Sequence, residues 1–392
     1  MTELNKGSVV FKHRPEDFIV EEMWASEICK ISDNSADLEN AVVDFGRLDV
    51  EDRRDFLTCE VEKINIDHFT LMSILAERLG NFPHELGWAG TKDKCAWTCQ
   101  KISIFNAKIE RIRNFSFKGI KLKNFKWAKH KIKVGDLTAN KFRIVLRDAD
   151  IDAVKILNKV RHSEYIPNLF GMQRFGSLRQ ENVRIGTLIL KEKFREAIFE
   201  YLIAYGESED EGTIRAKRKL KTEKNMLLAL DYFPKNLRVE CNILEYLKEH
   251  PGDWINALRI IGDKTLLIMC QAVQSKMFND ILERAIDEKG LNHNSTVSLL
   301  GYNSIFSPGR IGGIEKEILE SYNLELKDFR VSALPFLSLN CSVRNAFFKV
   351  ENIEVTTEND EIFEGSKKIN LNIQIESGSY ATTFLETFFD FR

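Results

Sequence analysis

Alternating apolar and polar positions predict strands in two separated parts of this chain. The clearest run is Lys141–Asp148, in which apolar residues occupy every second position, the period of a half-buried strand. A second strand is predicted from Phe18 to Met23, within a first part whose residues 99–147 suggest several basic strands. Strand patterns return near 336–350 and around 371–375. These strands would form one sheet that draws on both ends of the sequence.

Other segments follow the helical period. Asp67 is typical of a helix N-cap and Gly80 of a helix end, with apolar residues spaced for burial between them. The middle of the chain has further helical periods, at Arg195–Tyr205, Asn242–His250 and Thr265–Lys289. The glycine-rich stretch Pro308–Gly313 lacks the spacing of a phosphate-binding loop and is interpreted as a turn.

This order of elements predicts an α+β fold with an insertion. Residues 1–165 and 336–392 would form a core around a mixed, largely antiparallel sheet, and 166–335 a mostly helical inserted domain. No apolar run approaches the roughly 20 residues that span a bilayer. The seven cysteines form no CxxC pair, which argues against a zinc site or a disulfide framework. We expect a cytoplasmic protein without a membrane segment.

Charge is unevenly distributed although the net charge is only −2. Residues 101–147 contain 14 Lys or Arg and 2 acidic residues, interleaved with Phe and Trp. Cations among aromatic rings suit nucleic acid, because the cations neutralise phosphates and the rings stack on bases. A solvated strand face above core aromatics would give the same pattern, so both readings stand at this point.

The loop Ala89–Gln100, AGTKDKCAWTCQ, places Asp93 between two lysines. Gly90 permits a tight turn before it. A carboxylate flanked by cations stays ionised and can act as a nucleophile. Alone, the loop is weak evidence, since an aspartate beside a glycine is more often a turn former or a helix cap.

Four more segments accompany this loop. They are FKHRPEDFIVEE at Phe11–Glu22, GDLTANKFRIVLR at Gly135–Arg147, PNLFGMQRFG at Pro167–Gly176 and SGSYATT at Ser377–Thr383. Together and in this order, the segments resemble the signatures of the TruD family of tRNA pseudouridine synthases. The resemblance covers most of the chain.

The resemblance implies a role for each matched position. Asp93 corresponds to the catalytic aspartate, Phe142 to the aromatic ring that stacks on the uracil and Asn140 to the asparagine beside it. Lys12 corresponds to the basic residue of the first motif. In the segment that opens the insertion, the substrate-binding positions are Arg174 and Phe175, preceded by Gln173. As single residues, Phe142 is also explained as core, Asn140 as a turn residue, Lys12 as a surface cation and Arg174 as a structural partner of a buried acid.

By this resemblance the protein is an isomerase that converts a flipped-out uridine, at position 13 of tRNA, to pseudouridine with an aspartate nucleophile. Its partner would be tRNA, and it would act as a monomer without a cofactor or metal. The sequence leaves open whether Asp93 attacks the sugar, attacks the ring or abstracts a sugar proton. Two alternatives remain: a synthase for another RNA site, and a non-catalytic RNA-binding protein of the same fold.

Overall fold

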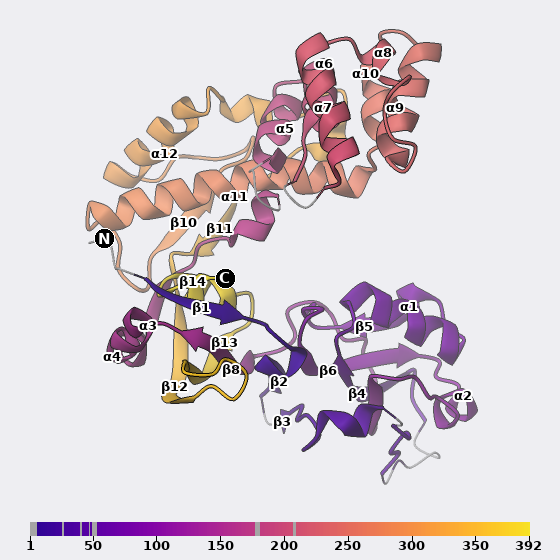
Figure 1. Ribbon diagram of the computed structural model, residues 1–392, viewed down its shortest axis with the longest axis vertical. Helices are drawn as coiled ribbons and strands as arrows, with labels where there is room; N and C mark the ends of the chain where they lie inside the picture. The colour runs from indigo at the N-terminus through magenta and orange to yellow at the C-terminus, as the bar shows by residue number, and fades with distance from the viewer. Residues whose placement is uncertain are drawn as a thin grey trace. The chain divides into compact units, whose positions relative to one another are not determined.

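The computed structural model describes residues 6–25, 27–39, 41–46, 48, 53–176, 181–206 and 209–392, except for the side chains of Met172 and Gln173. The chain folds into two compact units (Figure 1). Unit 1 comprises residues 1–166 and 348–392, and unit 2 comprises Pro167–Phe347. The expected insertion, 166–335, ends before β11 (Ser342–Asn345), which the structure assigns to unit 2 because it pairs with β10 (Thr296–Leu299).

Unit 1 is built around one large sheet with the strand order β7-β4-β6-β2-β8-β13-β12-β9. The strands are β1 (Gly7–Phe11), β2 (Phe18–Trp24), β3 (Glu27–Ile28), β4 (Phe56–Ile64), β5 (Leu86–Trp88), β6 (Trp97–Phe105), β7 (Ile120–Ala128), β8 (Ala139–Ala149), β9 (Tyr165–Pro167), β12 (Phe347–Asn359), β13 (Lys367–Glu376) and β14 (Phe389–Phe391). Most pairs are antiparallel, while β2 runs parallel to β6 and β1 parallel to β14. The mixed, largely antiparallel sheet predicted from the sequence is confirmed.

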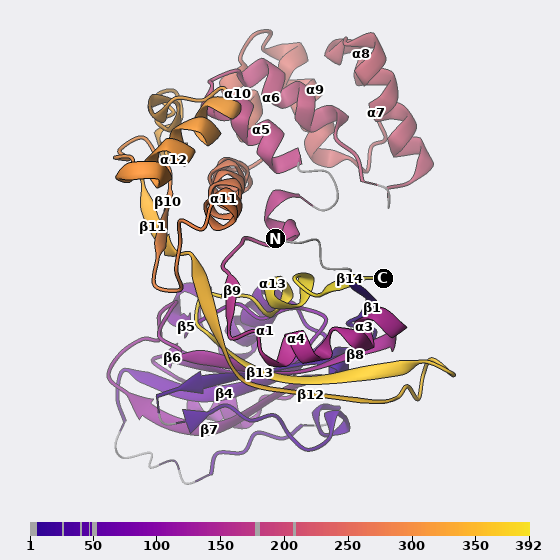
Figure 2. The same cartoon turned by 90° about the vertical axis from the view of Figure 1, so that its left-hand side faces the viewer.

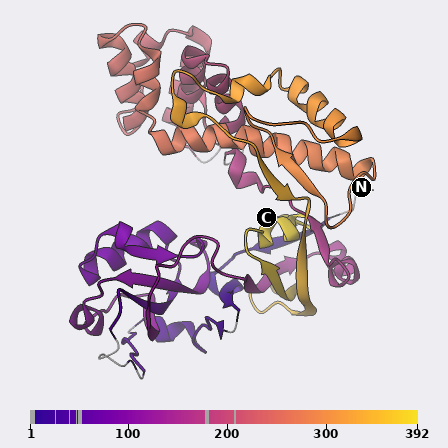
Figure 3. The ribbon, with the colours of Figure 1, turned by 180° about the vertical axis from the view of Figure 1, so that it is seen from behind.

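The central strand β8 joins the first and last parts of the chain. It pairs with β2 on one side and with β13 on the other, and Figures 2 and 3 show β13 continuing into its hairpin with β12. Buried Arg147 at the end of β8 adds an ionic connection. Its guanidinium donates to Asp17 at 2.7 and 2.8 Å and to Asp360 at 3.0 Å. Both carboxylates are buried as well, so the charges compensate each other.

Short helices accompany the sheet. They are α1 (His68–Leu79), α2 (Ile109–Arg113), α3 (Ile151–Lys155), α4 (Leu157–Arg161) and α13 (Ala381–Glu386). The predicted caps of α1 are confirmed. Asp67 accepts hydrogen bonds from the main-chain N–H groups of Phe69 and Thr70, and Gly80 ends the helix in the left-handed conformation with φ 69°. The strands predicted at Phe18–Met23 and Lys141–Asp148 are β2 and β8.

Unit 2 is mostly helical, as the sequence predicted. Its helices are α5 (Glu181–Leu190), α6 (Phe194–Ile203), α7 (Glu211–Glu223), α8 (Met226–Ala229), α9 (Arg238–Glu249), α10 (Trp254–Arg259), α11 (Asp263–Asp287) and α12 (Gly309–Ser321). The long helix α11, orange in Figure 1, contributes many side chains to a single core. Within the described residues, no helix has both the length and the apolar character needed to cross a bilayer.

The interpretation of Pro308–Gly313 as a turn was wrong. These residues begin helix α12, with Pro308 at its N-cap. A Cβ atom at Gly312 would lie 1.9 Å from the main-chain oxygen of Ser307, so the glycine allows close backbone approach inside the first turns. Buried Glu315 then accepts from the main-chain N–H of Ser307 at 2.7 Å. Gly312 therefore allows close packing at the start of α12 and does not form a turn.

Candidate active site

The Asp93 loop connects β5 to β6 in unit 1, two strands that pair antiparallel. The side chain of Asp93 is 47% exposed, and its Oδ2 atom lies 2.9 Å from Nζ of Lys12. The main-chain oxygen of Asp93 accepts a second hydrogen bond, at 2.6 Å, from Nζ of Lys63. Lys12, which follows β1, and Lys63 of β4 therefore both bind Asp93, whose carboxylate still reaches solvent.

Lys12 follows β1 and has an unusual backbone, with φ 55°. This left-handed conformation is strained for a residue with a side chain. Its ammonium lies 4.1 Å from the ring centroid of Phe18 and 5.0 Å from that of Phe11, a cation–π geometry. The thiol of Cys95 donates to the main-chain oxygen of Lys12 at 3.5 Å. The Asp93 loop and the Lys12 segment thus contact each other through both side chain and main chain.

One row of side chains crosses the same face of the sheet. In register across β13, β8, β2, β6 and β4 it consists of Ile373, Phe142, Val20, Thr98 and Lys63. Residues paired in this way point to the same face. Phe142 is therefore in the same row as Lys63, whose ammonium donates to the main-chain oxygen of Asp93.

Phe142 is largely enclosed by its own unit. It is only 7% exposed and belongs to the hydrophobic core around β8 and β13. Its ring centroid lies 5.8 Å from that of Phe18, the ring beneath Lys12. A short sequence of contacts, Asp93 to Lys12 to Phe18 to Phe142, connects the carboxylate with this aromatic ring.

Asn140 occupies the next row, two residues before Phe142 on β8 and on the same face. It pairs in register with Glu22 of β2 and Ile375 of β13. Its Oδ1 atom is buried and has no hydrogen-bond partner among the described residues. Such an acceptor costs free energy until a donor reaches it.

Buried charges on this face were not singled out in the sequence. Lys92, next to Asp93, forms an ion pair with Glu22 at 2.7 Å, and both side chains are almost fully buried. The second oxygen of Glu22 accepts from the main-chain N–H of Lys101 at 2.9 Å. Because breaking a buried pair leaves an uncompensated charge, this pair fixes the residue before Asp93 to β2.

His68 lies beside the same group of charges. It is 2% exposed, and neither ring nitrogen makes a hydrogen bond of ordinary geometry with a described residue, although the side chain of Gln100 is close enough to favour its charged form. Burial lowers its pKa to about 4, and the charges of Lys63 and Lys92 act in the same direction. The imidazole is therefore neutral at pH 7. Its ring packs edge-on against Trp88, with centroids 5.2 Å apart.

Arg174 and Phe175 belong to unit 2, whereas Asp93 belongs to unit 1. Phe175 is 2% exposed and part of the unit 2 core. Arg174 donates to Oε1 of Gln271 at 2.9 Å and to Oγ of Ser275 at 3.4 Å, both on α11. The motif therefore packs on α11, and the side chain of Gln173 lies outside the described ones.

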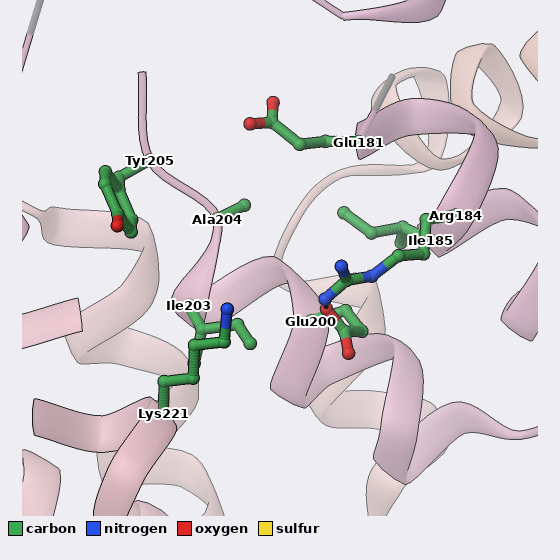
Figure 4. A pocket seen from close by; sticks show the side chains of 8 residues that line it. All are labelled: Glu181, Arg184, Ile185, Glu200, Ile203, Ala204, Tyr205 and Lys221. Atoms are coloured by element: carbon green, nitrogen blue, oxygen red, sulfur yellow. Dashed lines mark ion pairs between the residues drawn. The ribbon is translucent and has the colours of Figure 1, made fainter. Parts of the chain in front are cut away.

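A separate cavity of about 110 Å³ lies in unit 2 between α5, α6 and α7. Figure 4 shows the residues that line it: Glu181, Arg184, Ile185, Glu200, Ile203, Ala204, Tyr205 and Lys221. Arg184 points to Glu200, with which it forms an ion pair. The acidic and basic side chains balance, so this cavity has no excess charge for a phosphate. In the described part of the chain, no cluster of His, Cys, Asp and Glu side chains could hold a metal ion.

Comparisons with known proteins agree on one family. The sequence model of the family tRNA pseudouridine synthase D (TruD) matches residues 1–298 and 290–388. A protein of Methanocaldococcus jannaschii named "Probable tRNA pseudouridine synthase D 1" is 28% identical, over 100% of this chain and 97% of its own. The "Probable tRNA pseudouridine synthase D" of Methanococcus maripaludis is 30% identical, over 96% and 94%.

A solved structure is similar along nearly its whole length. It is the crystal structure of a Methanosarcina mazei protein described as "the Putative tRNA pseudouridine synthase D (TruD)". The two folds superpose with a TM-score of 0.77 at 25% identity, covering 99% of this chain and 94% of the other. The resemblance inferred from five short segments is therefore confirmed along the sequence and in the fold, and the chain belongs to the TruD family of tRNA pseudouridine synthases, which are isomerases.

Proposed function

We propose that this enzyme converts a uridine of tRNA, at position 13, to pseudouridine, with Asp93 as its catalytic carboxylate. The observation that carries the proposal is the 2.9 Å contact between Asp93 Oδ2 and Lys12 Nζ. The carboxylate is 47% exposed and so accessible to a substrate, while its partner is only 16% exposed. A fixed cation beside an accessible carboxylate orients the carboxylate, as covalent or base catalysis needs.

The reaction is an isomerisation and needs no outside reactant. The bond between N1 of uracil and C1′ of ribose breaks, the base turns, and C5 of the base bonds to C1′. The proton on C5 is lost and N1 gains a proton, so atoms and charge balance. Attack on C1′, attack on the ring and removal of a sugar proton all require a carboxylate beside the bond that joins ribose to uracil, which is the role we assign to Asp93.

The uridine must leave its stack to meet Asp93, because a base inside a helix is inaccessible. We assign Phe142 to the face of the extruded uracil and Asn140 to its edge. Uracil carries one N–H donor, N3–H, and the unpartnered Oδ1 of Asn140 is a matching acceptor. Since Phe142 is 7% exposed, this assignment requires β8 to become accessible when RNA binds. Arg174 and Phe175 are assigned to the RNA-binding side of unit 2.

The test is to map pseudouridine in tRNA transcripts treated with wild type and with Asp93→Asn, which keeps the shape but removes the nucleophile. We expect modification at one D-arm uridine with wild type and less than about 1% of that turnover with the variant, because losing an essential group costs orders of magnitude. Asp152→Asn, at an aspartate of α3 whose side chain is 47% exposed, is the matched control and should match wild type.

Each alternative predicts a different map. A synthase for another site would modify a different uridine, and still only with Asp93 intact. A non-catalytic RNA-binding protein would leave every uridine unchanged in both samples. Turnover by Asp93→Asn above about 1% would remove Asp93 from the catalytic role.

A further inference from the structure

Lys63 is the most deeply buried lysine in unit 1, with 0% exposure. It lies near the end of β4 and, by the alternation of side chains along a strand, on the same face as buried Leu57, Cys59 and Val61. An apolar residue would be expected there. The side chain instead ends in an ammonium group whose Nζ donates to the main-chain oxygen of Asp93 at 2.6 Å.

Burial of this ammonium is unfavourable by itself. It lowers the pKa of Lys63 to about 8, because the charged form is poorly solvated there. No carboxylate in the described part of the chain forms an ion pair with Lys63, and the acidic charges that act to raise its pKa are those of Asp93 and Asp67. An apolar side chain of similar length would fold as well or better. Stability therefore does not explain this lysine.

The surroundings of Lys63 leave its charge directed at the Asp93 loop. Thr98 is its register partner on β6, and neighbouring Gln100 donates from Nε2 to the main-chain oxygen of Gly90 at 3.4 Å, at the start of the loop. His68, neutral at pH 7, is the ring beside them. These neighbours are uncharged at that pH, so the carbonyl of Asp93 is the strongly bound acceptor.

From this geometry we infer that Lys63 is a positioning residue. It fixes the main-chain oxygen of Asp93 by a hydrogen bond, while Lys12 fixes the carboxylate of the same residue. The inference rests on the proposed catalytic role of Asp93. With the carbonyl fixed to β4 and the carboxylate to the end of β1, neither the loop nor the side chain can rotate away from its reacting position. Misplacement of a reacting group by about 1 Å can cost on the order of a hundredfold in rate.

The experiment compares wild type, Lys63→Met and Asp93→Asn in single-turnover assays on a tRNA transcript. Methionine keeps the length of the side chain and removes the charge and the donor. We expect Lys63→Met to lower the rate at saturating enzyme by about tenfold or more, with the dissociation constant for RNA within about twofold of wild type and a melting temperature no lower. Lys217→Met removes a lysine of unit 2 that is 3% exposed and should leave the rate unchanged.

Rates are normalised to the folded fraction, measured by circular dichroism on the same samples. A normalised Lys63→Met rate within about twofold of wild type would overturn the inference, as would weaker RNA binding with an unchanged saturating rate. If Lys63→Met does not fold, Lys63→Gln is measured instead. Its neutral donor is on a shorter side chain, and we expect the same loss of single-turnover rate. A wild-type rate for Lys63→Gln would overturn the inference. Turnover by Asp93→Asn above about 1% of wild type would instead overturn the proposed role of Asp93, so the two failures are distinguishable.

Discussion

The Nζ atom of Lys12 and the Oδ2 atom of Asp93 are 2.9 Å apart, although 81 positions separate the two residues in the sequence. The contact is made by the sheet: β1 pairs with β8, β8 with β2, and β2 runs parallel to β6, which follows the Asp93 loop. Lys12, which makes this contact, has a strained backbone with φ 55°. Strain of this kind persists where the surrounding structure determines it and is frequent at functional sites.

The first prediction follows from that contact. Lys12→Met should lower the single-turnover rate by roughly tenfold to a hundredfold, because the carboxylate loses the partner that orients it. The melting temperature should change little, since a pair with a 47% exposed carboxylate contributes little stability. Single-turnover reactions quenched at set times measure the rate, and thermal melts of the same protein measure the melting temperature.

Lys94→Met is the control for this prediction, because it removes the lysine that directly follows Asp93 in the sequence, at an exposed position. Its rate should stay close to that of wild type. Equal losses in the two variants would mean that general positive charge, rather than the Lys12 contact, supports the reaction.

The second prediction separates stacking from packing at Phe142. Truncation to alanine would cost about 3–5 kcal/mol of stability at so buried a position, so leucine is the sharper replacement. Phe142→Leu keeps most of the apolar volume but removes the aromatic face. Since stacking on a base contributes about 1–3 kcal/mol, we expect a rate loss of roughly tenfold to a hundredfold.

Phe348→Leu is the matched control, because Phe348 lies on β12 in the same core and is 1% exposed. Thermal melts should show similar losses for both variants, and single-turnover rates should fall only for Phe142→Leu. If both variants retain the wild-type rate per folded molecule, Phe142 is a core residue without a role in stacking.

Much of unit 1 could be predicted because local signals agree with the final packing. The alternation in β8 and the caps of α1 each depend on residues close together in the sequence. The Asp93 loop could be recognised as a candidate only together with other segments. Its contact with Lys12 could not be derived, because it depends on the pairing of strands that are far apart in the sequence.

Lys63 was missed although the sequence contains a signal for it. In FLTCEVEKI, the apolar phase of β4 continues through Val61 to Lys63, so a lysine occupies an inward position. Glu60 and Glu62 lie just before it in the sequence, and such a composition is also typical of a solvent-exposed charged strand. Pro308–Gly313 shows the opposite error, since its glycines indicated a turn but Gly312 serves close packing within α12. Neither case is decided by composition alone.

The third prediction concerns stability in acid. His68 is 2% exposed, and burial lowers its pKa to about 4 from an ordinary value of 6.5. The unfolded chain therefore binds a proton more readily than the folded chain between these values. The stabilising contribution of the neutral imidazole is present above pH 6.5 and is lost as the pH falls toward 4. The loss should approach roughly 3 kcal/mol.

His68→Phe keeps a ring against Trp88 without a titrating group. Urea unfolding at pH 7 and at pH 4.5 should show a smaller decrease in the free energy of unfolding for this variant than for wild type. Equal decreases in the two proteins would show that His68 does not titrate in this interval on unfolding.

The last prediction tests the basic segment 101–147 as an RNA-binding surface. Lys129 and Lys133 are exposed, and Lys131 donates from Nζ to the main-chain oxygen of His84 at 2.6 Å. If these three lysines lie along the RNA, each neutralised phosphate releases counterions, and binding weakens steeply with salt. The triple methionine variant should then bind tRNA with a flatter slope of log affinity against log salt. The difference should reach up to about 2.7, because each phosphate that a lysine neutralises contributes roughly 0.9 to the slope.

A variant with three other exposed lysines of unit 1 replaced, Lys155, Lys159 and Lys349, carries the same change in net charge and serves as the control. Filter binding between low and moderate salt measures both slopes. A general effect of net charge would flatten the two slopes equally, whereas RNA bound at the first three lysines flattens only the first. Unchanged slopes in both variants would assign Lys129, Lys131 and Lys133 to ordinary solvated surface, and the cations that meet the phosphates would then have to lie elsewhere on the protein.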